Sequence, residues 1–184
     1  MRMIELLRFG TSPGGGCDGA AFDALFHEAA ADVHGYALSL LGDRAGAEDV
    51  TALAFERLFR ARRRLDPRRG SPRALLFTIA RNAALDELRR RRRAPLASPA
   101  VEALAAEPVA ARETEAVERR ETVRRALVAL PARDREIVLL KFHGGLSNAE
   151  LAQALGISES NAGTRLSRAL AKLRDGELGI EEVA

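Results

Sequence analysis

The stretch "LGISESNAGTRLSRALAKLR", residues 155–174, decides the fold of this chain because it combines a tight turn with a basic amphipathic helix. Gly156 suits the turn, and Ser158 is a typical helix N-cap. Just upstream, Ser147 and Glu150 stand three residues apart, the spacing of a capping box at the start of another helix. Two helices joined by a short glycine-containing turn predict a helix-turn-helix.

The second helix of this pair has an apolar side and a polar side. Three residues of the first helix and three of the turn and second helix are expected to pack together: Leu151, Ala152, Leu155, Ile157, Leu166 and Leu170. The polar side presents residue types that a recognition helix uses on bases and phosphates: Ser158, Asn161, Thr164, Arg165 and Arg168. The alternative reading of these residues alone is an ordinary amphipathic helical hairpin.

Working outward, the chain divides into two helical halves. Residues 20–93 predict a first domain, and residues 117–175 a second domain that ends in the helix-turn-helix. Gly-rich residues 1–19 predict a flexible tail, Ala-, Pro- and Glu-rich residues 94–116 a linker, and residues 176–184 a short tail. The expected fold class is all-α: two small helical domains joined by a flexible linker.

Apolar spacing and turn residues place the individual helices. Gly42 and Pro131 are expected to end two of them, and residues 66–72 form a loop punctuated by Pro and Gly. Besides the helix-turn-helix pair, helices are expected over residues 22–41, 43–65, 73–93, 122–130 and 132–143. The apolar side of the helix at 73–93 is expected to consist of Leu75, Leu76, Ile79, Ala83 and Leu88.

Charge is unevenly distributed along the chain, although its net value is only +3. Residues 20–55 carry one Arg against six acidic residues, whereas residues 56–93 carry fourteen Arg against four acidic residues and contain no Lys. Arg makes bidentate contacts with phosphate, and each contact with a nucleic acid releases counterions. An acidic element that leads into an Arg block therefore predicts a polyanion site, the alternative being a solvated face in an Arg-rich chain.

Several other classes of protein do not fit the sequence. Cys17 is the single Cys, and His27, His34 and His143 are dispersed, so neither a disulfide framework nor a metal site is expected. No cluster has catalytic spacing, and no cofactor or small-molecule substrate is expected. No apolar run reaches the length of a membrane span, and the N-terminus lacks a signal-peptide core, so a cytoplasmic protein is expected.

Two longer stretches resemble one known family. Residues 130–174, "LPARDREIVLLKFHGGLSNAELAQALGISESNAGTRLSRALAKLR", are similar to region 4 of bacterial sigma factors. Residues 47–93, "AEDVTALAFERLFRARRRLDPRRGSPRALLFTIARNAALDELRRRRR", resemble region 2. Both regions in this order in so short a chain resemble the extracytoplasmic-function class of alternative sigma factors.

The resemblance implies a role for each half and makes the chain a non-enzymatic initiation factor. Region 4 would place its recognition helix in the major groove of the minus-thirty-five element. Region 2 would dock on the coiled coil of the largest subunit of core RNA polymerase through Glu48, Asp49, Phe55, Glu56 and Leu58. It would hold the minus-ten element and the separated strand through Arg63, Arg64, Arg68, Arg81, Asn82, Asp86, Arg89 and Arg90. The family also implies promoter DNA and an anti-sigma factor as partners.

The sequence departs from the family pattern at three places. Ala52 and Leu53 replace the usual Gln and Glu of the docking helix, and Leu75 replaces an aromatic residue. In the recognition helix, Gly163 removes a positive charge and lowers helix propensity. Two other functions fit the residues: a helix-turn-helix regulator that does not engage polymerase, and a module that titrates an anti-sigma partner without promoter activity.

Overall fold

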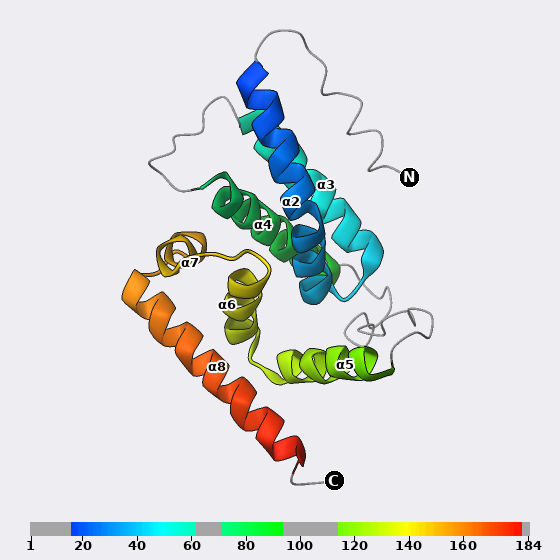
Figure 1. The fold of residues 1–184 in the computed structure, drawn as a ribbon, viewed down its shortest axis with the longest axis vertical. Coiled ribbons are helices and arrows are strands. Elements are labelled where there is room, and N and C mark those ends of the chain that lie inside the picture. Colours follow the sequence, from blue (N-terminus) through cyan, green and yellow to red (C-terminus); the bar gives the residue numbers. More distant parts are fainter. Residues whose placement is uncertain (1–15, 62–70, 94–113, 182–184) are drawn as a thin grey trace. The chain divides into compact units, whose positions relative to one another are not determined.

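The computed structural model describes residues 16–61, 71–93 and 114–181. The chain divides into two compact units, and the boundary between them in the sequence lies between Pro99 and Ala100. Every element in the described residues is a helix, which confirms the expected all-α class. Unit 1 contains α2 (Gly16–Leu41), α3 (Arg44–Ala61) and α4 (Pro72–Arg93). Unit 2 contains α5 (Thr114–Ala129), α6 (Ala132–Phe142), α7 (Asn148–Leu155) and α8 (Glu159–Glu181) (Figure 1).

Unit 1 is a three-helix arrangement in which each helix contacts the other two. Its core contains side chains that are almost completely buried, among them Val33, Tyr36, Leu58, Leu76 and Phe77. Gly42 forms the corner between α2 and α3 with a φ of 71°. This left-handed conformation is unfavourable for residues that have a Cβ atom. Asp43 then caps α3 by accepting a hydrogen bond of 2.9 Å from the Gly46 amide.

The buried side of α4 differs in part from the expected one. Leu76 and Ala83 are buried as predicted, but Leu75, Ile79 and Leu88 are only half-buried. The remaining buried positions of α4 are Ala74, Phe77, Ala80 and Ala84. Because α4 packs closely against both α2 and α3, small Ala side chains fit at the contacts. The sequence analysis considered mainly large apolar side chains and therefore did not include these Ala residues.

In unit 2, α8 packs against α5, α6 and α7 (Figure 1). Ile137, Leu139, Leu140, Leu146 and Leu151 are almost completely buried and form its core. The end of α5 before Pro131 agrees with the sequence. Arg135 of α6 closes that end, since its Nη2 donates to the carbonyl oxygens of Val128 and Leu130 at 2.6 and 3.1 Å.

The helix-turn-helix is present in unit 2 as predicted. Ser147 and Glu150 form the capping box at the start of α7, and Gly156 ends α7 with φ 67°. The backbone amide of Asn161 donates to Ser158 Oγ at 3.3 Å, and this hydrogen bond caps α8. Leu151, Ala152 and Leu166 are buried, and the other residues of the predicted contact are half-buried: Leu155, Ile157 and Leu170.

Three predicted boundaries differ in the structure. The helix α2 begins at Gly16, inside the stretch assigned to the N-terminal tail, and α5 begins at Thr114, inside the stretch assigned to the linker. The helix α8 continues to Glu181, inside the stretch assigned to the C-terminal tail. Residues 1–15, 62–70, 94–113 and 182–184 lie outside the described residues, and they include most of the predicted N-terminal tail, loop and linker. None of the described helices is long and apolar enough to cross a membrane.

Candidate functional sites

The first candidate site is the exposed side of α8. Asn161, Thr164 and Arg168 are exposed there, as predicted for a recognition helix, and Ser158 is exposed at its N-terminal cap. The Thr164 hydroxyl donates to the Ser160 carbonyl oxygen at 2.9 Å. These side chains occupy the first three turns of the helix, and such turns contact base edges in helix-turn-helix proteins.

Arg165 lies differently from the other predicted DNA contacts. Its side chain is only 20% exposed, and its Nε lies 3.8 Å from Asp134 Oδ1 on α6. Its Nη2 donates a short hydrogen bond to the Arg133 carbonyl oxygen. The guanidinium is therefore directed toward the start of α6, where it contributes to helix packing.

The second candidate site is the outer side of α4. Asn82, Asp86, Arg89 and Arg90 are exposed, and Arg81 is half-buried. Arg89 and Arg90 already have acidic partners: Arg89 Nη1 lies 2.9 Å from Asp86 Oδ1, and the Arg90 guanidinium donates to both carboxylate oxygens of Glu87 at 2.7 and 2.8 Å. The predicted contacts Arg63, Arg64 and Arg68 lie outside the described residues.

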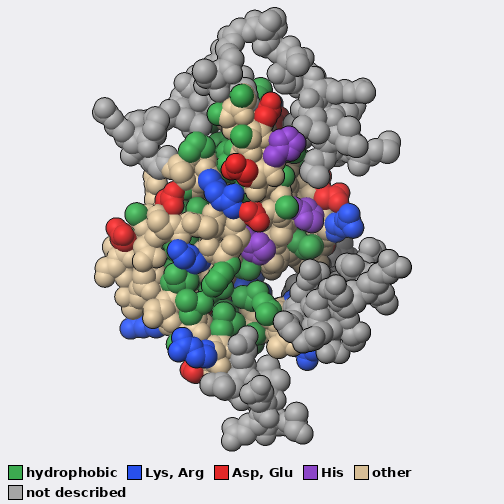
Figure 2. Space-filling model, in the orientation of Figure 1, with side chains coloured by type: hydrophobic (Ala, Val, Ile, Leu, Met, Phe, Trp, Pro, Cys, Tyr) green, Lys and Arg blue, Asp and Glu red, His purple; other side chains and the backbone are tan. Residues whose placement is uncertain are grey.

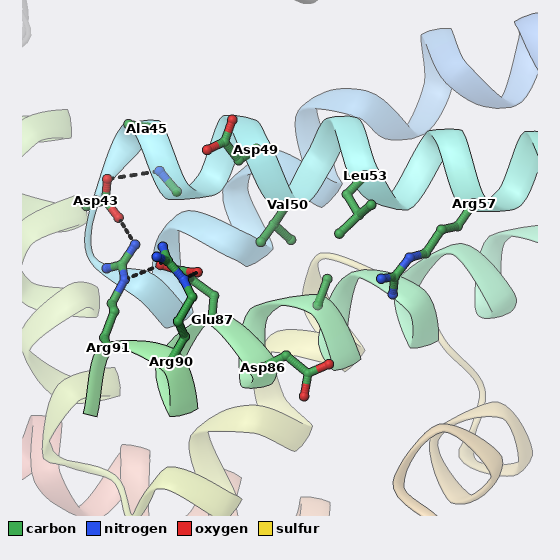
Figure 3. Close-up of a pocket in the computed structure, with 12 residues that line it drawn as sticks. Asp43, Ala45, Asp49, Val50, Leu53, Arg57, Asp86, Glu87, Arg90 and Arg91 are labelled. Atoms are coloured by element: carbon green, nitrogen blue, oxygen red, sulfur yellow. Dashed lines mark hydrogen bonds and ion pairs between the residues drawn. The ribbon is translucent and has the colours of Figure 1, made fainter. Parts of the chain in front are cut away.

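Arg91 holds the C-terminal end of α4 against the corner between α2 and α3. Its Nε donates to Glu87 at 2.7 Å, and its terminal nitrogens donate to Asp43 and to the Leu41 carbonyl oxygen (Figure 3). Hydrogen bonds from Arg90 and Arg91 lower the pKa of Glu87 from 4.5 to about 2. The sequence analysis missed Arg91 as a structural residue because five consecutive Arg, residues 89–93, offer no local sign of which one is buried.

A cleft of about 430 Å³ lies between α3 and α4. Val50, Leu53 and Ala83 form its apolar part, and acidic and basic side chains from both helices surround them: Asp43, Asp49, Arg57, Asp86, Glu87, Arg90 and Arg91 (Figure 3). The cleft thus offers a small apolar floor with charges of both signs. Elsewhere on unit 1, over α2 in the upper part of Figure 2, acidic, basic and His side chains are interspersed with apolar ones on the visible face.

The structure contradicts two of the predicted polymerase contacts. Phe55 and Leu58 are 2% and 1% exposed and belong to the core of unit 1. Phe55 packs edge-on against Phe26 and Phe22 of α2, with ring centroids 4.8 and 6.2 Å apart. They are buried because they follow Val50 and Ala54 along the inner side of α3. Glu48 and Asp49 are exposed and Glu56 is half-buried, so these three side chains reach the surface.

Among the described residues, no group of three or more His, Cys, Asp or Glu side chains is arranged to hold a metal ion. Several ionisable side chains of the two sites form ion pairs, among them Arg89–Asp86, Arg90–Glu87 and Arg165–Asp134. The exposed side of α8 and the charged cleft are surfaces suited to binding a macromolecule.

Sequence comparisons agree with this division into two sites. A family model described as sigma-70 region 2 matches residues 25–94, and one described as sigma-70 region 4 matches residues 120–173. The chain is 33% identical to the extracytoplasmic-function sigma factor SigL of Mycobacterium tuberculosis over 157 residues, 85% of this chain and 89% of the relative. It is 30% identical to RpoE of Cereibacter sphaeroides over 157 residues, 85% of this chain and 86% of the relative.

Two solved structures have similar folds. CnrH, in complex with the cytosolic domain of CnrY, is 26% identical with a TM-score of 0.61, over 85% of this chain and 86% of that one. The sigma factor RpoE of Bartonella quintana, in complex with the anti-sigma factor NepR, is 22% identical with a TM-score of 0.67, over 87% of this chain and 98% of that one.

Proposed function

Because the chain belongs to the extracytoplasmic-function class of the sigma-70 family, we infer that its two helical units divide promoter recognition between them. The chain is an alternative sigma factor, which binds core RNA polymerase and directs transcription initiation at specific promoters. The observation that carries this conclusion is the match of region 2 and region 4, in that order, to stretches that lie in two separate compact units. The residue roles that follow are proposals.

In this proposal, unit 2 reads the minus-thirty-five element with the exposed side of α8. Asn161 and Arg168 supply the amide and guanidinium groups that pair with base edges, and Thr164 supplies a methyl group. Ser158 lies at the N-terminus of α8, where the helix dipole favours a phosphate. Arg165 supports this surface from behind, since its guanidinium is engaged with α6.

Unit 1 holds the minus-ten element and the separated strand with the outer side of α4: Arg81, Asn82, Asp86, Arg89 and Arg90. The pairs Arg89–Asp86 and Arg90–Glu87 involve Arg side chains that are 64% and 77% exposed. Because the Arg side chains of these pairs are exposed, phosphates can compete with the carboxylates for them. Arg63, Arg64 and Arg68, which lie outside the described residues, are proposed for the same role.

Docking on core polymerase is assigned to the solvent-facing side of α3, with Glu48, Asp49 and Glu56. Leu53 takes the place of the buried Phe55 and Leu58 as the apolar contact, since it lines the cleft between α3 and α4. An apolar contact within a charged rim is typical of protein–protein interfaces. Leu53 is one of the positions where the sequence departs from the family pattern, so the departure itself lies on the proposed interface.

The proposal also covers the cellular setting. The polymerase performs the chemistry of RNA synthesis, and this chain acts as a non-catalytic factor in the cytoplasm. The likeness to the sigma factor that binds the anti-sigma factor NepR supports an anti-sigma factor as a further partner. Such a partner would compete with polymerase for the units described above.

The deciding experiment is reconstituted transcription with purified core RNA polymerase, the full chain and a library of promoter fragments, followed by sequencing of the RNA products. Start sites that appear only when the chain is added, with two shared upstream elements, are the expected result. A folded chain that binds no core polymerase would overturn the proposal and leave a DNA-binding regulator in its place.

The same assay tests the role of α4. Replacing Arg89 and Arg90 by Gln is expected to reduce promoter opening roughly tenfold, as the loss of about two phosphate contacts implies, and to reduce binding to core polymerase much less. The matched control replaces Arg124 and Arg125, which removes the same charge from α5, outside the proposed surfaces. Normal opening combined with weak polymerase binding would contradict the assignment of α4.

A further inference from the structure

Among the described residues, Asp134 is the acidic residue whose side chain forms ion pairs with two basic residues of α8. It lies in the first turn of α6, which has no side-chain cap. Its Oδ2 lies 2.6 Å from Lys172 Nζ, and its Oδ1 lies 3.8 Å from Arg165 Nε. A carboxylate in the first turn of a helix usually supports that helix, but here it joins α6 to α8.

The two partners of Asp134 stand seven residues apart on α8. Seven residues are about two helical turns, so both side chains emerge from the same side of α8 and converge on one carboxylate. Arg165 adds a second bond, to the Arg133 carbonyl oxygen. Contacts at two levels of one helix restrict both its rotation about its own axis and its sliding along α6.

Burial makes the contact with Arg165 more than an ordinary surface pair. The side chains of Asp134 and Arg165 are 17% and 20% exposed, whereas Lys172 is 53% exposed. Ion pairs shielded from water are screened less by salt than exposed ones. The partly buried Arg165 contact therefore provides the stable part of the link, and Lys172 adds an outer contact.

We propose that Asp134 is a positioning residue that sets the rotation of the recognition helix α8 through Arg165 and Lys172. Arg165 lies one residue after Thr164, four after Asn161 and three before Arg168, so these side chains share its segment of helix. Each residue turns an α-helix by about 100°. A small rotation at Arg165 therefore moves the proposed base contacts out of register while leaving their charges unchanged. This inference rests on the proposed function of unit 2.

The test uses holoenzyme formed from the full chain and core polymerase. Its probes are a promoter recovered in the transcription experiment and the same promoter with a scrambled minus-thirty-five element. The measured quantity is the ratio of transcription from the two promoters. Asp134→Asn is expected to lower this ratio roughly tenfold, the discrimination of one good base contact. Asp134→Glu, which keeps the charge, is expected to retain most of it.

Asp175→Asn is the matched control because it removes the same charge from an exposed position of α8. It is expected to raise binding to both promoters alike and to preserve the ratio. If Asp134→Asn unfolds unit 2, Lys172→Gln, which leaves Asp134 and Arg165 in place, is expected to lower the ratio to a smaller extent.

Three results separate the possibilities. Equal ratios for Asp134→Asn and Asp175→Asn in folded proteins would overturn the positioning role. A higher ratio for Asp134→Asn would also overturn it, because Asp134 would then be restraining Arg165 from reaching DNA. If the unmodified chain gives no promoter-specific transcription, the proposed function itself fails, and that result is visible before any variant is compared.

Discussion

At the scale of single residues, the lack of a side chain at Gly46 permits a partly buried ion pair between Arg91 and Asp43. Gly46 is buried in the first turn of α3, where Arg91 of α4 reaches Asp43. A Cβ atom at this position would lie 2.5 Å from Asp43 Oδ2 and closer still to Arg91 Nη2. The absence of a side chain is therefore what allows α4 to be fastened to the corner between α2 and α3.

Gly46→Ala is expected to lower the free energy of unfolding of unit 1 by up to about 1 kcal/mol, because the added Cβ atom displaces the ends of the Asp43 and Arg91 side chains and disturbs their ion pair, despite the better helix propensity of Ala. Urea unfolding followed by circular dichroism measures the change. In an Arg91→Ala background the cost should be smaller, since one of the two clashing groups is gone. An equal cost in both backgrounds would show that Arg91 does not occupy this position.

Glu87 connects the same link to pH. Because Arg90 and Arg91 hold its pKa near 2 in the folded chain, against 4.5 for the free side chain, the contribution of Glu87 to stability is complete above about pH 4.5. It is lost as the pH falls from about 4.5 toward 2. The shift corresponds to roughly 3 kcal/mol at most, and screening at the exposed Arg90 reduces this to about 1–2 kcal/mol.

Glu87→Gln is therefore expected to destabilise unit 1 by about 1–2 kcal/mol at neutral pH. The difference in unfolding free energy between the unmodified chain and this variant should shrink on acidification through that range. Urea titrations at several pH values measure it. A difference that stays constant down to pH 3 would exclude the hydrogen-bonded carboxylate as its cause.

At the scale of elements, α8 carries a glycine within its recognition segment. Gly163 is helical, and a Cβ atom added there would lie 3.4 Å from Asn148 Nδ2, which is close to an ordinary van der Waals contact. The glycine is therefore not required by packing. It reduces the intrinsic stability of the helix that is proposed to enter the major groove.

Gly163→Ala is expected to stabilise unit 2 by about 0.5–1 kcal/mol, the difference in helix propensity between the two residues. Thermal unfolding measures it. The matched control is the reverse change at an exposed site of the same helix, Ala171→Gly, which should destabilise by a similar amount. Destabilisation by Gly163→Ala would mean that the Asn148 side chain cannot move away from the added methyl group.

At the scale of the whole molecule, each unit has a core of its own. Leu76 in unit 1 and Leu151 in unit 2 are both completely buried. The chain therefore combines two small domains, each of which depends on a few Leu, Ile and Phe residues. Such an arrangement favours two separate unfolding transitions.

Leu76→Ala and Leu151→Ala are each expected to cost about 2–5 kcal/mol, the range for a buried Leu. Each should lower only the transition of its own unit. Calorimetry of the full chain, compared with limited proteolysis of each variant, assigns the transitions. A simultaneous shift of both would show that the units unfold as one.

The extent to which the sequence predicts each feature depends on how local its cause is. The helix-turn-helix, the capping box at Ser147 and the turn at Gly156 were all predictable, because backbone hydrogen bonds and φ values within a few residues determine them. The family followed from the same stretches. Phe55 and Leu58 were assigned wrongly to a surface, because that assignment followed the resemblance and set aside their place on the inner side of α3.

The sequence by itself determined the all-helical class, the two halves, the helix-turn-helix and the family of this protein, since periodicity, caps and turn residues act over short distances. Only the tertiary structure decided which charges pair between segments that are distant in the sequence. Arg91 meets Asp43 across 48 residues, and Lys172 meets Asp134 across 38. No local pattern distinguishes these residues from their neighbours, because their partners are selected by the packing of helices that are distant in the sequence.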